Sequence, residues 1–423
     1  MLTIHAPEVV TTSTGVRLQA QFEASGGVSE CLWFETAPEY GQYLSPERSD
    51  AFVVALLLYA MSRHEQEVRV CAPMSERLYY CLTKYLVDVV AAMNPALAPI
   101  RISGPCLGSS IGTGQAAGTG LSCGVDSLAT VIDHMGDDCP PAYRLTHFTF
   151  YNVGASGDYG GEAARRLFKQ RAKKSRLFAE ERGVPLVELD SNLSEVLGAS
   201  FLPTHTYRNV AATLALQKLF SRYYYASGLP LSRFKLDWHD PAHYDAFALN
   251  MLSTESLELY SSGLSLTRVE KTRKVSAFEP SYRHLNVCVA DHHNCSKCHK
   301  CLRTMLTLEV LGRLHLYDKV FDLTQYQRRR VRYLATVLAL GASDPFMGEI
   351  ADAIRQTRFP IPARAMIRSW FMKYRYYHAF DVLRRTFREL CPGQKVSSGT
   401  QPDSSECGSA VCKPDPFQHP VSA

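Results

Sequence analysis

Several features that would place this sequence in a large class are missing from it. The longest apolar run, at 51–61, is too short to cross a bilayer, and the first residues lack the basic start of a secretion signal. Lysine and arginine outnumber aspartate and glutamate by only 46 to 41, which is too small an excess to predict a nucleic-acid or membrane partner from charge. We therefore expect a cytoplasmic protein with no membrane partner.

The chain also lacks internal repeats. Its composition and its pattern of predicted helices and strands change three times along its length, which divides it into four regions. With 423 residues and 46% hydrophobic content it can form one large domain with attachments. We expect an N-terminal α/β accessory domain at 1–110 and a second, larger α/β domain at 115–310. A helical region should follow at 311–391, and a tail at 392–423, rich in Ser, Pro and Gly, is expected to be disordered.

Strand and helix patterns alternate in the central region. After an expected strand at 118–121 and a helix at 127–134, the sequence predicts strands at 145–153 and 184–190 and helices at 161–181 and 207–225. Such alternation is typical of a parallel sheet flanked by helices, with a ligand at the carboxyl edge of its strands. Beyond the central region we expect helices at 302–316, 326–340 and 363–390.

The loop between the first central strand and its helix is the strongest local signal. Its sequence is Ser-Cys-Gly-Val-Asp-Ser, comprising Ser122, Cys123, Gly124, Val125, Asp126 and Ser127. A strand-to-helix loop of this kind directs backbone N–H groups and the helix N-terminus at one anion. The two serines add hydroxyl donors, glycine permits close approach of the backbone, and the aspartate is an oxygen ligand suited to Mg²⁺.

No Gly-Lys-Ser or Gly-Lys-Thr occurs here, which excludes the common phosphate-binding loop of that sequence. The loop resembles the Ser-Gly-Gly-x-Asp-Ser loop of the pyrophosphate-releasing (PP-loop) ATP pyrophosphatases, with Cys123 in place of the first glycine. The resemblance implies that the loop wraps the β- and γ-phosphates of ATP and that Asp126 helps to hold Mg²⁺. Cys123 either fills the space of a small residue or carries sulfur as an activated thiol, because a helix N-terminus can lower a thiol pKa.

Four of the thirteen cysteines are closely spaced. Cys288, Cys295, Cys298 and Cys301 follow the pattern C-x6-C-x2-C-x2-C, which suits tetrahedral Zn²⁺ held by thiolates. Four cysteine ligands would close the site, so we expect a structural zinc loop at 288–301. An iron–sulfur cluster is the alternative, since similar spacing occurs in ferredoxin-like runs.

The loop and the cysteine group together resemble 7-cyano-7-deazaguanine synthase, a family of the PP-loop ATP pyrophosphatases. Arg208-Asn209 resembles the Arg-Asn element that lies near the nucleotide in that family, and Lys271 falls in a segment resembling a lysine-containing motif. The resemblance covers roughly 119–305. It implies an adenine-nucleotide alpha-hydrolase-like (Rossmann-like, HUP) fold, with Asp126, Ser127, Arg208 and Lys271 as catalytic residues and Asn152 beside the adenine.

The function implied by this resemblance is an ATP-dependent ligase. It would adenylate a carboxylate such as that of a deazapurine, release pyrophosphate, and pass the acyl group to ammonia or an amine. ATP, Mg²⁺ and Zn²⁺ are the expected cofactors. The extra terminal regions favour a protein or peptide co-substrate and are compatible with a homodimer, whereas a nucleic-acid partner is left open but not favoured. The alternatives are a sulfur-inserting enzyme and a non-catalytic subunit that binds nucleotide and zinc.

Overall fold

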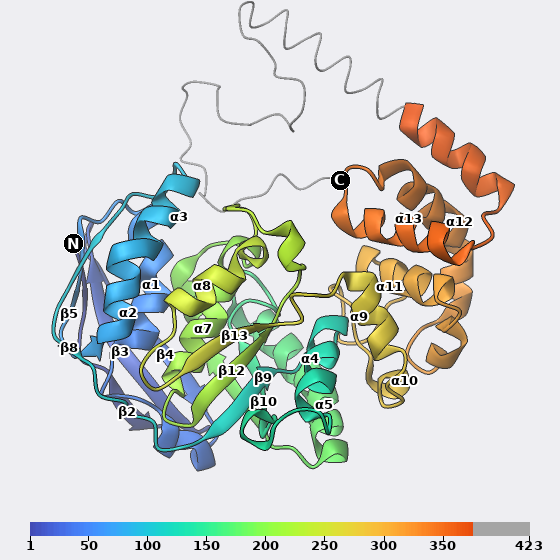
Figure 1. Cartoon of the computed structure of the whole chain (residues 1–423). Coiled ribbons are helices and arrows are strands. Elements are labelled where there is room, and N and C mark those ends of the chain that lie inside the picture. The colour runs from blue at the N-terminus through green and yellow to red at the C-terminus, as the bar shows by residue number, and fades with distance from the viewer. Residues whose placement is uncertain (375–423) are drawn as a thin grey trace, which may run out of the picture.

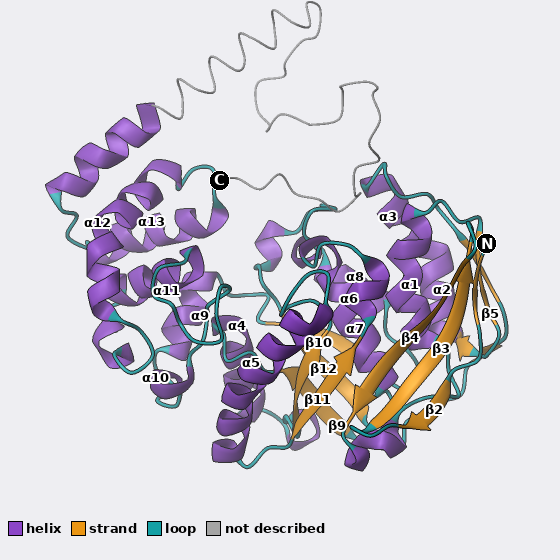
Figure 2. Cartoon of the chain, turned by 180° about the vertical axis from the view of Figure 1, so that it is seen from behind, coloured by secondary structure: helices purple, strands orange, loops and turns teal. Residues whose placement is uncertain are grey.

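The structure, a computed structural model, describes residues 1–374 of the chain. The tail expected at 392–423, and the expected helical segment beyond residue 374, lie outside the described residues. Within them the protein is an α/β fold built on one sheet of eleven strands, flanked by helices (Figures 1 and 2). This agrees with the expected α/β class, with a central sheet flanked by helices.

The central region of the chain contributes five parallel strands, which form one half of the sheet. Their spatial order is β11-β10-β9-β12-β13, so the first strand along the chain, β9, lies in the middle. The chain therefore builds outward on one side of β9 and then returns to build on the other, which creates a switch point at its carboxyl end. The strands are β9 (Ala116–Gly120), β10 (His147–Asn152), β11 (Leu186–Ser191), β12 (Phe220–Ala226) and β13 (Glu258–Ser262).

The N-terminal region extends the same sheet. Its strand β4 pairs antiparallel with β11, so the predicted accessory region and the central region share continuous backbone pairing. The predicted boundary between 110 and 115 therefore stays a prediction. The N-terminal strands are β1 (Leu2–Ile4), β2 (Glu8–Thr11), β3 (Val16–Ala24), β4 (Val28–Thr36), β5 (Glu67–Val70) and β7 (Arg101–Ser103), with β6 (Met74–Ser75) and β8 (Cys106–Leu107) in a separate pair.

Helices cover the sheet and enclose two apolar cores. One core includes α1 and α7, and the other includes α4 with the later helices α11, α12 and α13. The first group comprises α1 (Asp50–Ser62), α2 (Glu76–Cys81), a π-helical turn (Leu82–Leu86), α3 (Val87–Met93), α6 (Leu193–Leu197), α7 (His205–Ala215) and α8 (Asp245–Met251). The second comprises α4 (Val125–Met135), α5 (Gly161–Arg182), α9 (Arg268–Val275), α10 (Ser281–His284), α11 (His299–Val310), α12 (Leu323–Leu340) and α13 (Pro345–Thr357).

The late helices form a group of their own beside α4 and α5. Figure 1 shows α9 to α13 on the opposite side of the molecule from the N-terminal strands. A last helix occupies 363–374 at the end of the described chain. The predicted helical character of this region is confirmed as far as residue 374.

The helix predicted at 207–225 is wrong in its second half. α7 ends at Ala215, and residues 220–226 form strand β12, which pairs with both β9 and β13. The aromatic run Tyr223-Tyr224-Tyr225 therefore lies in a strand, where aromatic side chains pack well on both faces of a sheet. Tertiary pairing decides this segment, because an apolar run of this length is compatible with either state.

Among the described residues, no helix combines the length and the apolar character needed to cross a membrane.

Candidate functional site

The loop after β9 lies at the switch point of the sheet. It joins β9 to the N-terminus of α4, as predicted. Ser122 Oγ accepts a hydrogen bond from the Gly124 N–H at 3.3 Å and lies 3.2 Å from Ser127 Oγ. Gly124 is the N-cap of α4, and no side chain caps this helix. The first N–H groups of α4 therefore lie at a site suited to an anion.

Cys123 adopts a left-handed backbone conformation, with φ at 55°. Its side chain is fully buried, and this burial raises the pKa of its thiol to about 12. The carbonyl of Cys123 accepts a hydrogen bond from the Asn286 N–H at 2.8 Å, which joins the loop to the segment leading to the cysteine group. A buried thiol with a raised pKa is a poor nucleophile, so the geometry favours the space-filling interpretation.

A cleft of about 510 Å³ opens over this loop. Its walls come from the loop and the first turn of α4, the turn after β10, the start of α9, the segment around Cys288 and the first turns of α11. Phe150, Leu167 and Phe201 contribute apolar surface, whereas Arg268, Lys300 and Arg303 contribute positive charge. The cleft therefore combines a cationic region with an apolar region.

Asp126 is the acidic centre of the cationic region. Its Oδ2 atom lies 2.7 Å from Nη1 of Arg268, and its Oδ1 atom lies 3.7 Å from Nζ of Lys271. Lys271 is 2% exposed and donates a hydrogen bond to the Ser227 carbonyl at 2.7 Å. Burial, followed by the charge of Arg268, lowers the pKa of Lys271, while Asp126 opposes this shift. The structure thus brings the predicted residues Asp126, Ser127 and Lys271 together.

Lys300 and Arg303 were absent from the predicted site, although they line the cleft beside Asp126. Burial and the neighbouring Arg268 lower the pKa of Arg303 to about 10, and burial with Arg303 lowers the pKa of Lys300. Arg303 remains charged at neutral pH, because its lowered pKa still lies well above 7. The sequence does place these two basic residues on either side of Cys301. The cysteine spacing alone gives no reason to assign them to the site.

Arg208, predicted as a catalytic residue, lies buried in the first turn of α7. It is 1% exposed, and its guanidinium donates hydrogen bonds to the carbonyls of Ala199 (2.6 Å), Asp158 (3.1 Å) and Val153 (3.3 Å). It does not line the cleft. Gly154 permits this contact, since a Cβ there would lie 2.7 Å from Arg208. Arg208 therefore holds the two loops that form one wall of the cleft.

Asn152 also lies behind the cleft wall. It is 6% exposed, and its side chain donates a hydrogen bond to Asp190 Oδ1 at 2.7 Å. Its predicted place beside an adenine stays a prediction.

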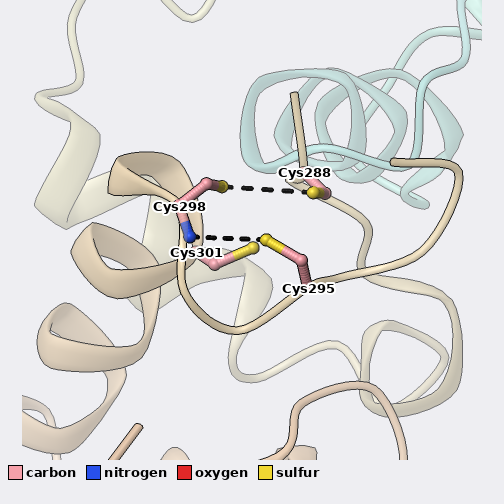
Figure 3. Close-up of side chains that lie close together, drawn as sticks. All are labelled: Cys288, Cys295, Cys298 and Cys301. Atoms are coloured by element: carbon pink, nitrogen blue, oxygen red, sulfur yellow. Dashed lines mark hydrogen bonds between the residues drawn. The ribbon is translucent and has the colours of Figure 1, made fainter. Parts of the chain in front are cut away.

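The four predicted metal ligands converge. Their sulfur atoms all lie within 4.8 Å of one another, and those of Cys288 and Cys298 are 4.0 Å apart (Figure 3). Cys298 and Cys301 belong to the start of α11, Cys295 lies on the preceding turn, and Cys288 approaches from the other side. A hydrogen bond from Cys301, together with backbone N–H groups, lowers the pKa of the Cys298 thiol.

This geometry fits one metal ion. Zinc–sulfur bonds of about 2.3 Å in a tetrahedron place the sulfurs about 3.8 Å apart, close to the separation of Cys288 and Cys298. Ser296, between two of the cysteines, adopts a left-handed φ of 55°, which turns the chain tightly enough for Cys295 and Cys298 to face each other. The four cysteines can therefore hold a metal such as zinc.

None of the protein-family models matches this chain, and neither a curated protein nor a solved structure matches it significantly.

Proposed function

We propose that the protein is an ATP-dependent ligase of the PP-loop type, related to 7-cyano-7-deazaguanine synthase, with an adenine-nucleotide alpha-hydrolase-like fold. The observation that supports this most directly is the charge around Asp126. Four cations, Arg268, Lys271, Lys300 and Arg303, lie around Asp126 at the N-terminus of α4. Further carboxylates, among them Glu349, act on some of these cations from outside the cleft. Like charges repel at this distance, so a polyanionic ligand bound among them would be stabilised.

A nucleoside triphosphate has the shape and charge that the cleft accepts. Its phosphates would face the cations and the free N–H groups of α4, and its base would lie on the apolar surface of Phe150, Leu167 and Phe201. The strand order around β9 supports the same placement, because nucleotides bind at the switch point of doubly wound sheets.

The proposed reaction has two steps. A carboxylate oxygen of the substrate attacks the α-phosphorus of ATP, and pyrophosphate leaves from the same phosphorus. Ammonia or an amine then attacks the acyl carbon, AMP leaves with the bonding electron pair, and the amine loses a proton. The cations stabilise negative charge on the leaving pyrophosphate, which is the main source of acceleration in such transfers.

Bound metal ions would have separate roles. Asp126 has an Oδ1 atom with no hydrogen-bond partner among the described residues, and this atom would hold Mg²⁺. Mg²⁺ would neutralise phosphate charge. Zn²⁺ at the four cysteines would hold the start of α11 in place, since four thiolates leave no open position for catalysis.

The test is incubation with ATP, Mg²⁺ and deazapurine carboxylates, with and without ammonia, while AMP and pyrophosphate are measured. We expect both products in equal amounts. ADP and phosphate would contradict the mechanism, and ATP binding without AMP would identify a non-catalytic subunit.

A substitution at Asp126 locates the reaction. We expect Asp126→Asn to lower AMP formation by roughly a hundredfold or more, because it removes the carboxylate from the phosphate site. Asp133→Asn is the matched control, since Asp133 lies on the same helix but pairs with Lys274 outside the cleft. Equal rates in the two variants would show that the reaction occurs elsewhere.

A further inference from the structure

Helix α13 lies outside the region that resembles known ATPases, but it contacts two cations of the cleft. We propose that Phe346 and Glu349 on α13 are positioning residues of the anion site, so that the helical C-terminal region is a required part of it. This inference rests on the proposed function. It concerns how α13 positions Arg268 and Arg303 in the cleft.

Phe346 contacts both arginines of the cleft. Its ring centroid lies 4.2 Å from the guanidinium carbon of Arg303 and 5.5 Å from that of Arg268. A ring face attracts a cation through its quadrupole and carries no net charge. Phe346 therefore holds two like-charged groups near each other without adding a negative charge of its own to the cleft.

A third arginine on these helices is held by a carboxylate. Arg330 of α12 is paired with Glu309 of α11, with Nε 2.6 Å from Oε1 and 2.9 Å from Oε2. That carboxylate neutralises Arg330, which lies outside the cleft. Arg268 shares Asp126 with Lys271, and the Nε atoms of Arg268 and Arg303 are buried without a hydrogen-bond acceptor among the described residues. Arg330 also lies over a ring, that of Phe359, at 5.6 Å from its centroid. What distinguishes Arg303 is that it forms no ion pair with a carboxylate among the described residues, whereas Arg268 pairs with Asp126.

Glu349 fixes the helix that carries Arg268. Its Oε2 atom accepts hydrogen bonds from the backbone N–H groups of Arg268 at 2.7 Å and Val269 at 3.3 Å. Thr267 accepts from the next N–H group of the turn, that of Glu270. Glu349 therefore satisfies donors at the start of α9 that would otherwise lack partners, and it sets the position of Arg268 and, one turn later, of Lys271.

The position of α13 is itself well determined. Asp344 caps its N-terminus through the Met347 N–H at 2.8 Å, and Pro345 occupies its first turn. Ile350 and Ile354 are buried in the core shared with α11 and α12. Phe346 and Glu349 thus act from a rigid support, as a preorganised site requires.

The test is calorimetric titration of the full-length, zinc-loaded protein with ATP and with inorganic pyrophosphate. Phe346→Leu keeps an apolar side chain but removes the ring, and we expect it to weaken binding of both ligands roughly five- to tenfold. Phe346→Tyr restores the ring and should bind within about twofold of the unmodified protein. Rescue by tyrosine but not by leucine is an effect that a purely space-filling role would not produce.

Asp352→Asn is the matched control on α13, because Asp352 is exposed and pairs only with Arg355 one turn away. It should leave binding unchanged. Thermal unfolding of each variant shows whether the fold is retained. Equal affinities for Phe346→Leu and the unmodified protein would overturn the inference while leaving the proposed function intact. Failure of the unmodified protein to bind ATP or pyrophosphate would overturn both.

Glu349 has its own readout. We expect Glu349→Ala to accelerate hydrogen exchange of the Arg268 and Val269 amides, and to weaken ATP binding severalfold, because the start of α9 loses its acceptor. Glu349→Gln keeps one acceptor oxygen and should show a smaller change in both measurements. Unchanged exchange and unchanged affinity in Glu349→Ala would exclude a positioning role for this residue.

Discussion

Arg208 and Arg303 are both enclosed arginines near the same cleft, but their partners give them different roles. Arg208 donates to loop carbonyls on one side of the cleft, whereas Arg303 is held by a ring and lines the cleft. The residue type alone does not distinguish these roles. The roles are distinguished by the number of acceptors that each guanidinium already binds. A guanidinium whose N–H donors are all engaged has no donor left for a ligand.

Arg208→Lys tests the structural role. Lysine cannot reproduce the planar set of donors, so carbonyls of both loops would lose their partners in a buried place. We expect a loss of about 3 kcal/mol in the free energy of unfolding, measured with denaturant. A variant that keeps its stability and loses only AMP formation would instead show that Arg208 contacts the substrate.

Cys123→Ala tests whether the thiol takes part in chemistry. The thiol is buried and its pKa is raised, so its removal should leave ATP-dependent AMP formation within about threefold and change stability by about 1 kcal/mol. Product analysis and thermal unfolding are sufficient measurements. Loss of activity in a folded variant would revive the sulfur-carrier interpretation.

At the scale of elements, the metal loop and the anion site are one structural unit. Lys300 lies between Cys298 and Cys301, and the Asn286 N–H donates a hydrogen bond to the carbonyl of Cys123 in the loop after β9. A metal ion that closes the cysteine loop therefore also fixes the first turn of α11 with its cations. Loss of the metal should disturb the cleft as well as the loop.

Cys295→Ser is the variant for metal loss. We expect it to contain less than one zinc ion per chain by elemental analysis, to unfold at a lower temperature, and to bind ATP at least tenfold more weakly. Cys31→Ser is the control, since Cys31 lies on β4 and is not one of the four converging cysteines. Iron in the purified protein would support a cluster, and unchanged ATP affinity in a zinc-free variant would separate the two sites.

At the scale of the whole molecule, a buried carboxylate joins the N-terminal region to the centre. Asp50 of α1 accepts hydrogen bonds from the Ser75 N–H at 2.8 Å and from Gln217 Nε2 at 2.9 Å, the latter just after α7. Burial raises the pKa of Asp50 to about 6 despite these bonds. Folding therefore favours the protonated form of this group.

The sign of the pH dependence follows from that shift. Between about pH 4 and 6 the folded state binds more protons at Asp50 than the unfolded state does, so the stability contributed by this residue falls as pH rises. We expect the unmodified protein to lose about 3 kcal/mol relative to Asp50→Asn across this window. Denaturant unfolding of both proteins at pH 4 and pH 7 measures the difference, and a constant difference would contradict the buried-charge assignment.

Local sequence determined the features that depend on neighbouring residues. Two such features could be predicted, namely the strand-to-helix loop with Ser122 and Asp126 and the group of closely spaced cysteines. Each spans only a few residues, and the types of those residues restrict backbone geometry and ligand chemistry. The helix predicted to continue through 216–225 is wrong, because this apolar stretch forms a strand by pairing with β9 and β13.

Tertiary structure decided which charges meet. Asp126, Arg268, Arg303 and Phe346 come from four separate elements, and no pattern in the sequence links them. Tertiary structure also placed Arg208 behind the cleft wall, and it brought Phe346 of α13 into contact with the cleft arginines. Contacts between distant segments depend on how helices pack on the sheet, which local propensity does not encode. The sequence alone therefore predicted the strand-to-helix loop and the group of four cysteines, but not the set of cations around Asp126.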